Sequence, residues 1–169
     1  GFWMLLKFAM QMVLILVAGY AIAISPPAGK LIDRLARKVR TPVGVYGTVV
    51  LVGCVFSLIS WGWVALTAVL ARELGVRVKK VDFRLLAACV YVTFLPWHGG
   101  LSGSIPLVLN TENNFLIEAG VLPSTIPTTL TLASTMNIVC NIVLVLTLPL
   151  LMILMRPTGD RVETFADLQ

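Results

Sequence analysis

A tract of glycines and serines, residues 97–106, holds the side chains in this sequence that are best placed to do chemistry. It reads WHGGLSGSIP and contains His98, Ser102 and Ser104. Glycine gives a helix no side-chain support and proline removes a backbone donor, so these ten residues are not expected to form an ordinary helix. Their freed backbone groups and hydroxyls suit an anionic ligand or a small cation. We therefore interpret this glycine–serine tract as a candidate binding site.

Nucleophilic catalysis is a second chemistry that the same tract would allow. Gly100-Leu101-Ser102-Gly103 resembles the nucleophile motif of rhomboid-type intramembrane serine proteases. Those proteases take their general base from a separate helix, whereas the single histidine here lies four residues before the serine. We expect the protein not to be an enzyme. An intramembrane serine hydrolase stays as an alternative that requires His98 within hydrogen-bond reach of Ser102.

The composition indicates an integral membrane protein as the setting of this tract. The 169 residues are 58% hydrophobic and 12% charged, and the mean hydropathy is +0.94. The net charge of +5 comes from short basic clusters between apolar runs, a pattern that orients membrane proteins and does not indicate nucleic-acid binding. The three cysteines are isolated in apolar sequence, which favours buried packing over a metal site or a disulfide. No metal or cofactor is therefore expected.

The first part of the chain predicts a transmembrane helix followed by a helix on the membrane surface. Residues 8–24 are apolar over about the shortest length that spans a bilayer. After Ser25-Pro26-Pro27, cations alternate with apolar residues at helical spacing, which predicts a cytoplasmic amphipathic helix at 28–40. By the positive-inside rule its cations place this side of the protein in the cytoplasm.

The next segment, residues 42–71, is too long for one ordinary span and too short for two. No charged residue occurs in it, and as a single helix it would be about 45 Å long, against a hydrocarbon core of about 30 Å. Cations flank it on both sides, and Ser60-Trp61-Gly62 interrupts it near the middle. We therefore predict a re-entrant helical hairpin; one long tilted helix or two tight spans are the alternatives.

The remaining chain is expected to contain a broken helix and a last spanning helix. Residues 85–109 run into the membrane and meet the glycine–serine tract before they have crossed it, and no Lys or Arg occurs in residues 85–155. The loop 110–127, which carries two glutamates, is therefore placed outside. Residues 129–155 are predicted to return as a transmembrane helix, with a polar cytoplasmic tail at 156–169.

Polar residues recur on one face of the predicted last helix. Thr131, Ser134, Asn137 and Asn141 fall within a sector of roughly 120° at about 100° per residue. Such a stripe faces protein or a cavity, and hydrogen bonding between helices accounts for it more often than ligand contact. Together with the interruptions at 60–62 and in the glycine–serine tract, it fits secondary transporters, in which discontinuous helices hold an anionic substrate and its coupling cation.

Short stretches along essentially the whole chain occur in an order that suggests a family. They are Gly1-Phe2-Trp3, Met10-Gln11-Met12, Ser25-Pro26-Pro27, Thr41-Pro42, Trp61-Gly62, Ala71-Arg72-Glu73, Leu85-Leu86 and the run from Gly99 to Leu107. Together they resemble the short-chain fatty acid transporter family of bacteria, the acetoacetate and butyrate uptake type. The resemblance implies a multi-pass carrier of the inner membrane, within a group of ion-coupled transporters, for short-chain carboxylates such as acetoacetate or butyrate. Ser60 and His98 depart from the expected pattern, in which Asn and Gly would stand.

The resemblance also implies what this chain contributes. Family members are more than twice its length, so we expect an all-α polytopic membrane protein that forms one half of an inverted-repeat transporter. Its expected architecture is about three spanning helices, a re-entrant hairpin and a broken helix. The expected partners are the carboxylate, the lipid bilayer and the second half of the transporter, with a homo-oligomer as a further option and no nucleic acid. A non-transporting membrane scaffold subunit is the rival interpretation.

The candidate substrate- or ion-binding residues lie at the two interruptions and on the last helix. They are Gly100, Ser102, Gly103, Ser104, Ser60, Trp61, Gly62, Ser134 and Asn137. We expect those in the glycine–serine tract to bind the carboxylate or a coupling ion, which would be a proton or sodium. The residues at 60–62 are expected to form the opposing hairpin tip, and the last two to line the cavity.

Overall fold

The computed structural model describes residues 2–112, 114–157 and 162–168, and within them the regular secondary structure is entirely helical. The predicted all-α class is therefore confirmed. The elements are α1 (Phe2–Ala23), α2 (Pro26–Lys38), α3 (Pro42–Ile59), α4 (Trp63–Arg77), α5 (Phe83–Val92), η1 (Leu95–Gly99), α6 (Ser104–Asn110), α7 (Phe115–Glu118), α8 (Thr135–Leu154) and η3 (Phe165–Leu168).

Several of these helices are suited to a bilayer. Within the described residues, three stretches are long and apolar enough to cross a membrane: Pro42–Ile59, the broken stretch Phe83–Glu118 and Thr135–Leu154. The bent pair of α1 and α2 is a fourth if it counts as one span. The outward side chains of α1 and α8 are mostly large, apolar and exposed, as expected for surfaces that contact lipid or another membrane protein.

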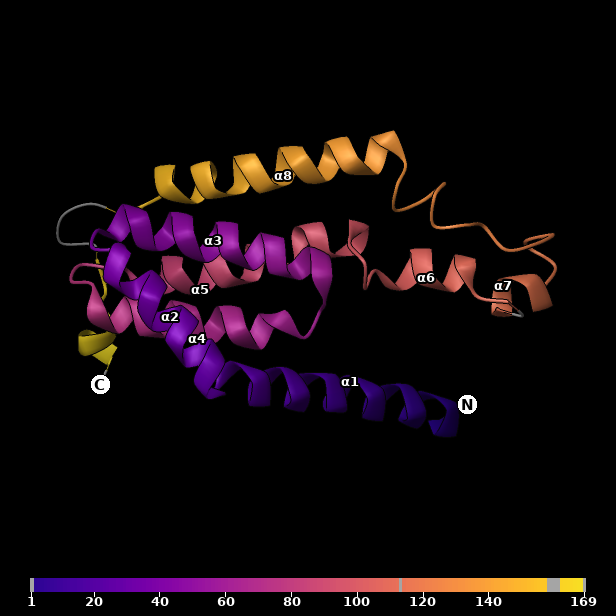
Figure 1. Cartoon of the computed structure of the whole chain (residues 1–169), viewed down its shortest axis with the longest axis horizontal. Helices are drawn as coiled ribbons and strands as arrows, with labels where there is room; N and C mark the ends of the chain where they lie inside the picture. The colour runs from indigo at the N-terminus through magenta and orange to yellow at the C-terminus, as the bar shows by residue number, and fades with distance from the viewer. Residues whose placement is uncertain (1, 113, 158–161, 169) are drawn as a thin grey trace.

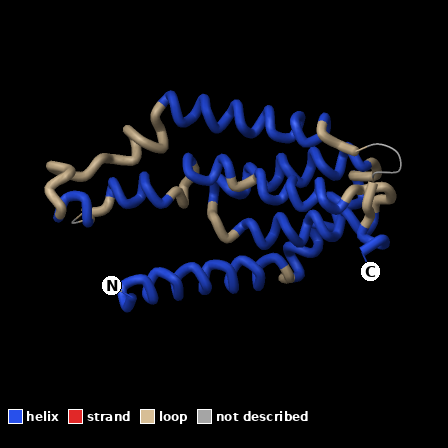
Figure 2. The backbone as a smooth tube through the Cα atoms, turned by 180° about the vertical axis from the view of Figure 1, so that it is seen from behind, coloured by secondary structure: helices blue, strands red, loops and turns tan. Residues whose placement is uncertain are grey.

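The helices form an elongated bundle (Figure 1). α3, α4, α5 and α8 lie side by side, and α1 lies on the opposite side of the α3–α4 pair from α8. Seen from behind, α6 and α7 extend beyond the bundle at the end away from the C-terminus (Figure 2). The core lies where α3, α4 and α5 meet and includes the fully buried side chains of Tyr46, Val49, Leu70, Leu74 and Cys89.

α1 and α2 meet at a sharp bend. Ser25 is the N-cap of α2, and Pro26 occupies the first helical position, where the missing proline N–H costs least. The two helix axes differ in direction by 62°. Because the proline pair starts the helix, α2 lies two residues ahead of the predicted range 28–40. α1 in turn extends further toward the N-terminus than the predicted range 8–24.

Residues 42–77 fold back on themselves as two antiparallel helices (Figure 1). α3 ends at Ile59; its C-cap, Ser60, is extended, and residues 60–62 form a short connection that we call the hairpin tip. α4 continues to Arg77, beyond the predicted limit of 71, because its last turns carry exposed charges and pair Arg77 with Glu73 at 3.2 Å. A single long helix over this segment, one of the alternatives, is excluded.

The predicted broken helix at 85–109 consists of α5, η1 and α6. α5 starts at Phe83 because the Asp82 carboxylate caps it, accepting the N–H of Leu85 at 2.8 Å. The non-helical part of the glycine–serine tract then separates η1 from α6. The loop predicted at 110–127 contains α7 and continues to α8.

The last helix begins later than the predicted range 129–155. Ser134 is its N-cap: the hydroxyl accepts the N–H of Asn137 at 3.3 Å and donates to the carbonyl of Thr131 at 2.8 Å. A serine cap satisfies an N–H of the first turn that has no partner within the helix. Residues 129–134 are therefore turns that precede α8, and Thr131 does not belong to its polar face.

The described part of the predicted tail, 156–169, packs against the bundle. The N–H of Phe83 donates to the carbonyl of Glu163 at 2.7 Å, and the N–H of Glu163 donates to the carboxylate of Asp82 at 3.0 Å. The ring of Phe165 meets that of Phe83 edge to face, with centroids 4.7 Å apart. Residues 158–161 and 169 of the tail lie outside the described residues.

Candidate functional site

The two interruptions of the sequence meet in space. The end of α3 and the hairpin tip lie beside η1, about midway along the molecule (Figure 1). The N–H of Leu101 donates to the carbonyl of Leu58 at 2.6 Å. A Cβ added to Gly100 would lie 2.5 Å from the same carbonyl oxygen. The backbone of the tract is therefore in direct contact with the last turn of α3, and only glycine permits that approach at position 100.

The Ser102 hydroxyl joins the glycine–serine tract to the hairpin tip. Its oxygen accepts the backbone N–H of Trp61 at 2.9 Å and the indole N–H of Trp97 at 3.1 Å. A hydroxyl has two acceptor lone pairs and one proton, so these two bonds use its acceptor capacity. Among the described residues, this hydroxyl donates no hydrogen bond. The Ser102 hydroxyl is thus held in place and remains able to donate to a ligand.

Two asparagines of α8 bind the other end of the tract. The Asn137 amide donates to the carbonyl of Gly99 at 2.9 Å, and the Asn141 amide reaches the same carbonyl at 3.4 Å. The Asn141 amide also donates to the side-chain oxygen of Asn137 at 3.1 Å. A Cβ at Gly99 would collide with both side chains. The polar face of α8 therefore holds the interrupted backbone of the tract.

A cavity of about 480 Å³ lies between α3, the tract and α8. Val55 and Leu58 line it from α3, the backbone at 99–101 from the tract, and Asn137 and Asn141 from α8; the rest of its lining is aliphatic. Its volume lies within the ~300–1,000 Å³ usual for small-molecule sites. Among the residues that the structure describes, no ionisable side chain lines the cavity, so this part of the chain can meet a charge there with hydrogen-bond donors and dipoles.

A smaller cavity, about 250 Å³, lies on the other side of the hairpin tip, against α1. Ser60, Gly62 and Trp63 line it from the tip, and Gly19 is among the α1 residues that line it. A Cβ at Gly19 would collide with the carbonyl of Gly62. The α3–α4 hairpin thus has one cavity on its α8 side, lined by the end of α3, and a smaller one on its α1 side, lined by the hairpin tip.

The structure brings together most of the predicted site residues but not all of them. Trp61 contacts Ser102 directly, Gly100 packs on the end of α3, and Asn137 holds the tract. Ser60 accepts the N–H of Gly62 at 3.3 Å within the tip. Buried Gly103 lies against the carbonyl of His98.

Two predicted residues lie apart from these contacts. Ser104 starts α6 and is exposed, and Ser134 caps α8 and does not line the larger cavity.

Sequence reasoning missed three participants. Trp97 and Gly99 lie in the candidate tract and Asn141 on the predicted polar stripe, but none of the three was named as a binding residue. The spacing of Asn137 and Asn141, four residues apart on a helix, is a signal that could have placed both amides on one carbonyl. No local signal pairs the indole of Trp97 with a serine five residues later, because that contact depends on the fold of the tract.

His98 is exposed, and its ring lies against that of Trp97 with centroids 4.5 Å apart. Among the described residues, its ring makes no hydrogen bond with Ser102, whose oxygen is occupied by two N–H donors. A serine nucleophile needs a base within hydrogen-bond reach, so the structure does not favour the hydrolase alternative. In the described ranges, no group of three or more His, Cys, Asp or Glu side chains is placed to hold a metal ion.

Comparison with known proteins matches this arrangement to one family. The profile of the family described as short chain fatty acid transporter matches residues 1–167. A Haemophilus influenzae protein, provisionally named a short-chain fatty acid transporter, is 38% identical over 169 residues that cover 97% of this chain and 38% of that protein. An Escherichia coli protein of the same provisional name is 44% identical over 125 residues, 73% of this chain and 28% of that protein. No solved structure matches.

The chain therefore spans well under half the length of these relatives. The family match extends over nearly every residue and includes both interruptions that meet at Ser102. With several apolar helices of spanning length, the protein is a multi-pass membrane protein that belongs to the short-chain fatty acid transporter family.

Proposed function

We propose that the chain supplies part of a secondary transporter that carries short-chain fatty acids, such as acetoacetate or butyrate, across the bacterial inner membrane. It would work by alternating access, coupled to a proton or sodium, with the second half of an inverted repeat as its partner. Family membership and the relatives' greater length support this proposal. The contact between the hairpin tip and the glycine–serine tract is the structural observation that carries it.

The chemistry of the site suits a small amphipathic anion. A short-chain carboxylate combines an aliphatic body with a group that accepts hydrogen bonds. The cavity of about 480 Å³ is lined mainly by aliphatic side chains, which suit the body. Ser102 follows the lining residue Leu101 in sequence without lining the cavity itself, and its hydroxyl would donate to a carboxylate held at this end of the cavity. The asparagine pair holds the backbone that shapes the cavity. Buried carboxylates need such donors, because an unpaired charge in a dry site is costly.

The lack of charge in the cavity supports ion coupling. No Lys, Arg or His side chain of the described residues lines it, so this part of the transporter would offer the carboxylate no fixed positive charge. A co-transported proton or sodium ion would balance that charge and make occupancy of the site depend on both species. The cavities on the α8 side and the α1 side of the α3–α4 hairpin would serve as the volumes of the two accessible states.

Uptake of radiolabelled butyrate into proteoliposomes tests the proposal with the full-length transporter. Ser102→Ala is expected to abolish uptake, since it removes the donor, whereas Ser102→Thr keeps a hydroxyl and is expected to retain measurable uptake. Ser124→Ala is the control, because Ser124 is exposed in the loop before α8 and is not a candidate site residue, and it should transport like the unmodified protein. Membrane insertion is checked for every variant. Undiminished uptake by a correctly inserted Ser102→Ala variant would discard the site, and absence of uptake by the unmodified protein would favour the scaffold interpretation.

A further inference from the structure

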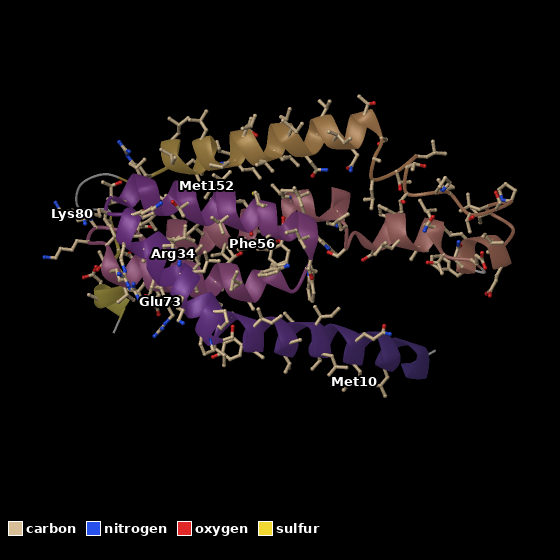
Figure 3. All side chains as sticks on the ribbon, viewed as in Figure 1. Met10, Arg34, Phe56, Glu73, Lys80 and Met152 are labelled. Carbon is tan, nitrogen blue, oxygen red and sulfur yellow. The ribbon has the colours of Figure 1, made fainter. Side chains whose placement is uncertain are left out.

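A basic pocket lies at the charged end of the bundle, remote from the cavities at the hairpin tip. It has a volume of about 510 Å³ and is lined by Arg37, Arg40, Arg77 and Lys79, with Ala36, Val39 and Val78. Figure 3 shows Arg34, Glu73 and Lys80 at this same end, and Met10 of α1 far from it. The pocket is formed where α2 ends and where α4 passes into the loop before α5.

The charges of the pocket are not balanced by carboxylates. Arg77 is engaged, because its guanidinium contacts Asp33 at 2.6 Å and Glu73 at 3.2 Å. Arg37, Arg40 and Lys79, in contrast, form no ion pair with any carboxylate of the described residues. The pocket thus presents three cations to one volume, which favours an anionic ligand.

Helix capping explains only part of this accumulation of cations. Cations in the last turn of a helix complement the negative end of its dipole, which accounts for Arg37 of α2 and Arg77 of α4. Arg40 and Lys79 lie beyond those helices. Lys79 lies in a loop fixed by buried Val81 and by Lys80, whose φ of 63° is left-handed. The backbone fold therefore places Arg40 and Lys79 at the pocket although neither is needed to complement the dipole of α2 or α4.

The pocket lies where the chain passes from charged to apolar sequence. Arg40 is two residues from the start of α3, a helix apolar enough to span a membrane. The pocket has an apolar side, formed by Ala36, Val39 and Val78. The amphipathic helix α2 packs its buried residues Ile32 and Ala36 into the core and leaves its cations exposed. Such a boundary corresponds to the head-group level of a bilayer, where helices of this kind lie.

We propose that this pocket binds the phosphate of one anionic phospholipid, of the phosphatidylglycerol class, in the leaflet that faces α2. Guanidinium groups bind phosphate oxygens in a paired geometry, which Arg37 and Arg40 can supply, and the ammonium of Lys79 adds a third contact. The apolar side of the pocket receives the start of the acyl chains. Basic pockets at this level of membrane proteins bind anionic head groups. This site is separate from the transport site and does not depend on the proposed substrate.

Native mass spectrometry of the full chain in detergent, with added phosphatidylglycerol or phosphatidylethanolamine, tests the proposal. The unmodified protein should retain one phosphatidylglycerol in preference to the zwitterionic lipid. The variant R37Q/R40Q/K79Q should lose about tenfold or more in apparent affinity for phosphatidylglycerol, since each cation near the lipid surface contributes. The variant K30Q/R34Q/R72Q removes three cations that do not line the pocket and should change that affinity by less than about twofold.

Three outcomes would overturn the proposal. Equal losses in both triple variants would mean general surface attraction, and equal retention of the two lipids would mean no head-group selectivity. Displacement of phosphatidylglycerol by low millimolar inorganic phosphate would assign the pocket to a free anion. Far-UV circular dichroism checks folding, and R40Q/K79Q, which changes only residues outside helices, is a second variant that should lose about fivefold.

Discussion

The backbone N–H of Trp61 donates to the side-chain oxygen of Ser102 across 41 positions of sequence, at a distance of 2.9 Å. Through this bond the break in the α3–α4 hairpin and the break between η1 and α6 stabilise each other. Each break frees backbone groups that a membrane interior would not tolerate unpaired. The tract supplies an acceptor to the hairpin tip through Ser102, and the last turn of α3 supplies one to the tract through the carbonyl of Leu58.

Replacement of Ser102 should therefore cost stability as well as uptake. Ser102→Ala leaves the partly buried N–H of Trp61 without its acceptor, whereas the indole of Trp97 keeps the backbone carbonyl of residue 102 at 3.1 Å. We expect a loss of about 1–3 kcal/mol in the free energy of unfolding. Ser104→Ala should change it by less than about 0.5 kcal/mol, because the residue is exposed. Thermal unfolding in detergent measures both. Equal stability of the two variants would show that the Ser102 bonds contribute nothing.

Glycine replacements within the tract should differ in severity according to what the new Cβ meets. At Gly100 it meets the backbone of Leu58, which cannot move aside, whereas at Gly99 it meets the ends of the two asparagine side chains. Gly100→Ala should therefore cost more stability than Gly99→Ala. Gly29→Ala is the control, because nothing lies within 4 Å of its Cβ position, and in α2 it should stabilise by up to about 1 kcal/mol. The midpoint of thermal unfolding measures the effect of each variant. A larger decrease for Gly99→Ala than for Gly100→Ala would contradict the close approach of Gly100 to the backbone of Leu58.

The sequence allowed the interruptions themselves to be predicted, because glycine, proline and serine are local signals for a break. It also predicted that the hairpin tip opposes the tract, through the analogy with discontinuous helices. It could not predict which atoms meet: the bonds of Ser102 and Gly99 join residues about 40 positions apart, and no periodicity reports such contacts. The start of α8 was missed for a different reason, since an apolar run looks the same whether its first residues form turns or a helix.

The bonds between α8 and the tract should behave as one unit. A Cβ at Gly99 would collide with the side-chain amides of Asn137 and Asn141. The double variant Asn137→Ala/Asn141→Ala removes both amides and therefore the collision. Gly99→Ala should then lower the free energy of unfolding by at least about 1 kcal/mol less in the double-alanine variant than in the unmodified protein. A coupling energy of this size is usual for residues in contact. A double-mutant cycle from denaturant unfolding measures this coupling. Strict additivity would mean that the carbonyl of Gly99 is not held by these amides.

Asp82 should control how firmly the tail is attached to the bundle. One carboxylate oxygen caps α5 through Leu85, the other accepts the N–H of Glu163, and the side chain is only 4% exposed. Asp82→Ala should lower the free energy of unfolding by about 1–3 kcal/mol and raise hydrogen exchange at Glu163. Arg84→Gln breaks only the exposed ion pair to the same glutamate and should cost less than about 1 kcal/mol.

Hydrogen exchange separates these two contributions to tail docking. Phe165→Ala leaves the Asp82 bonds intact but removes the contact with Phe83. It should therefore raise exchange at Glu163 less than Asp82→Ala does, while the first turn of α5 stays protected. If Phe165→Ala instead exposed both segments equally, aromatic packing rather than the shared carboxylate would hold the tail. In that case the start of α5 would depend on the tail and not on its own cap.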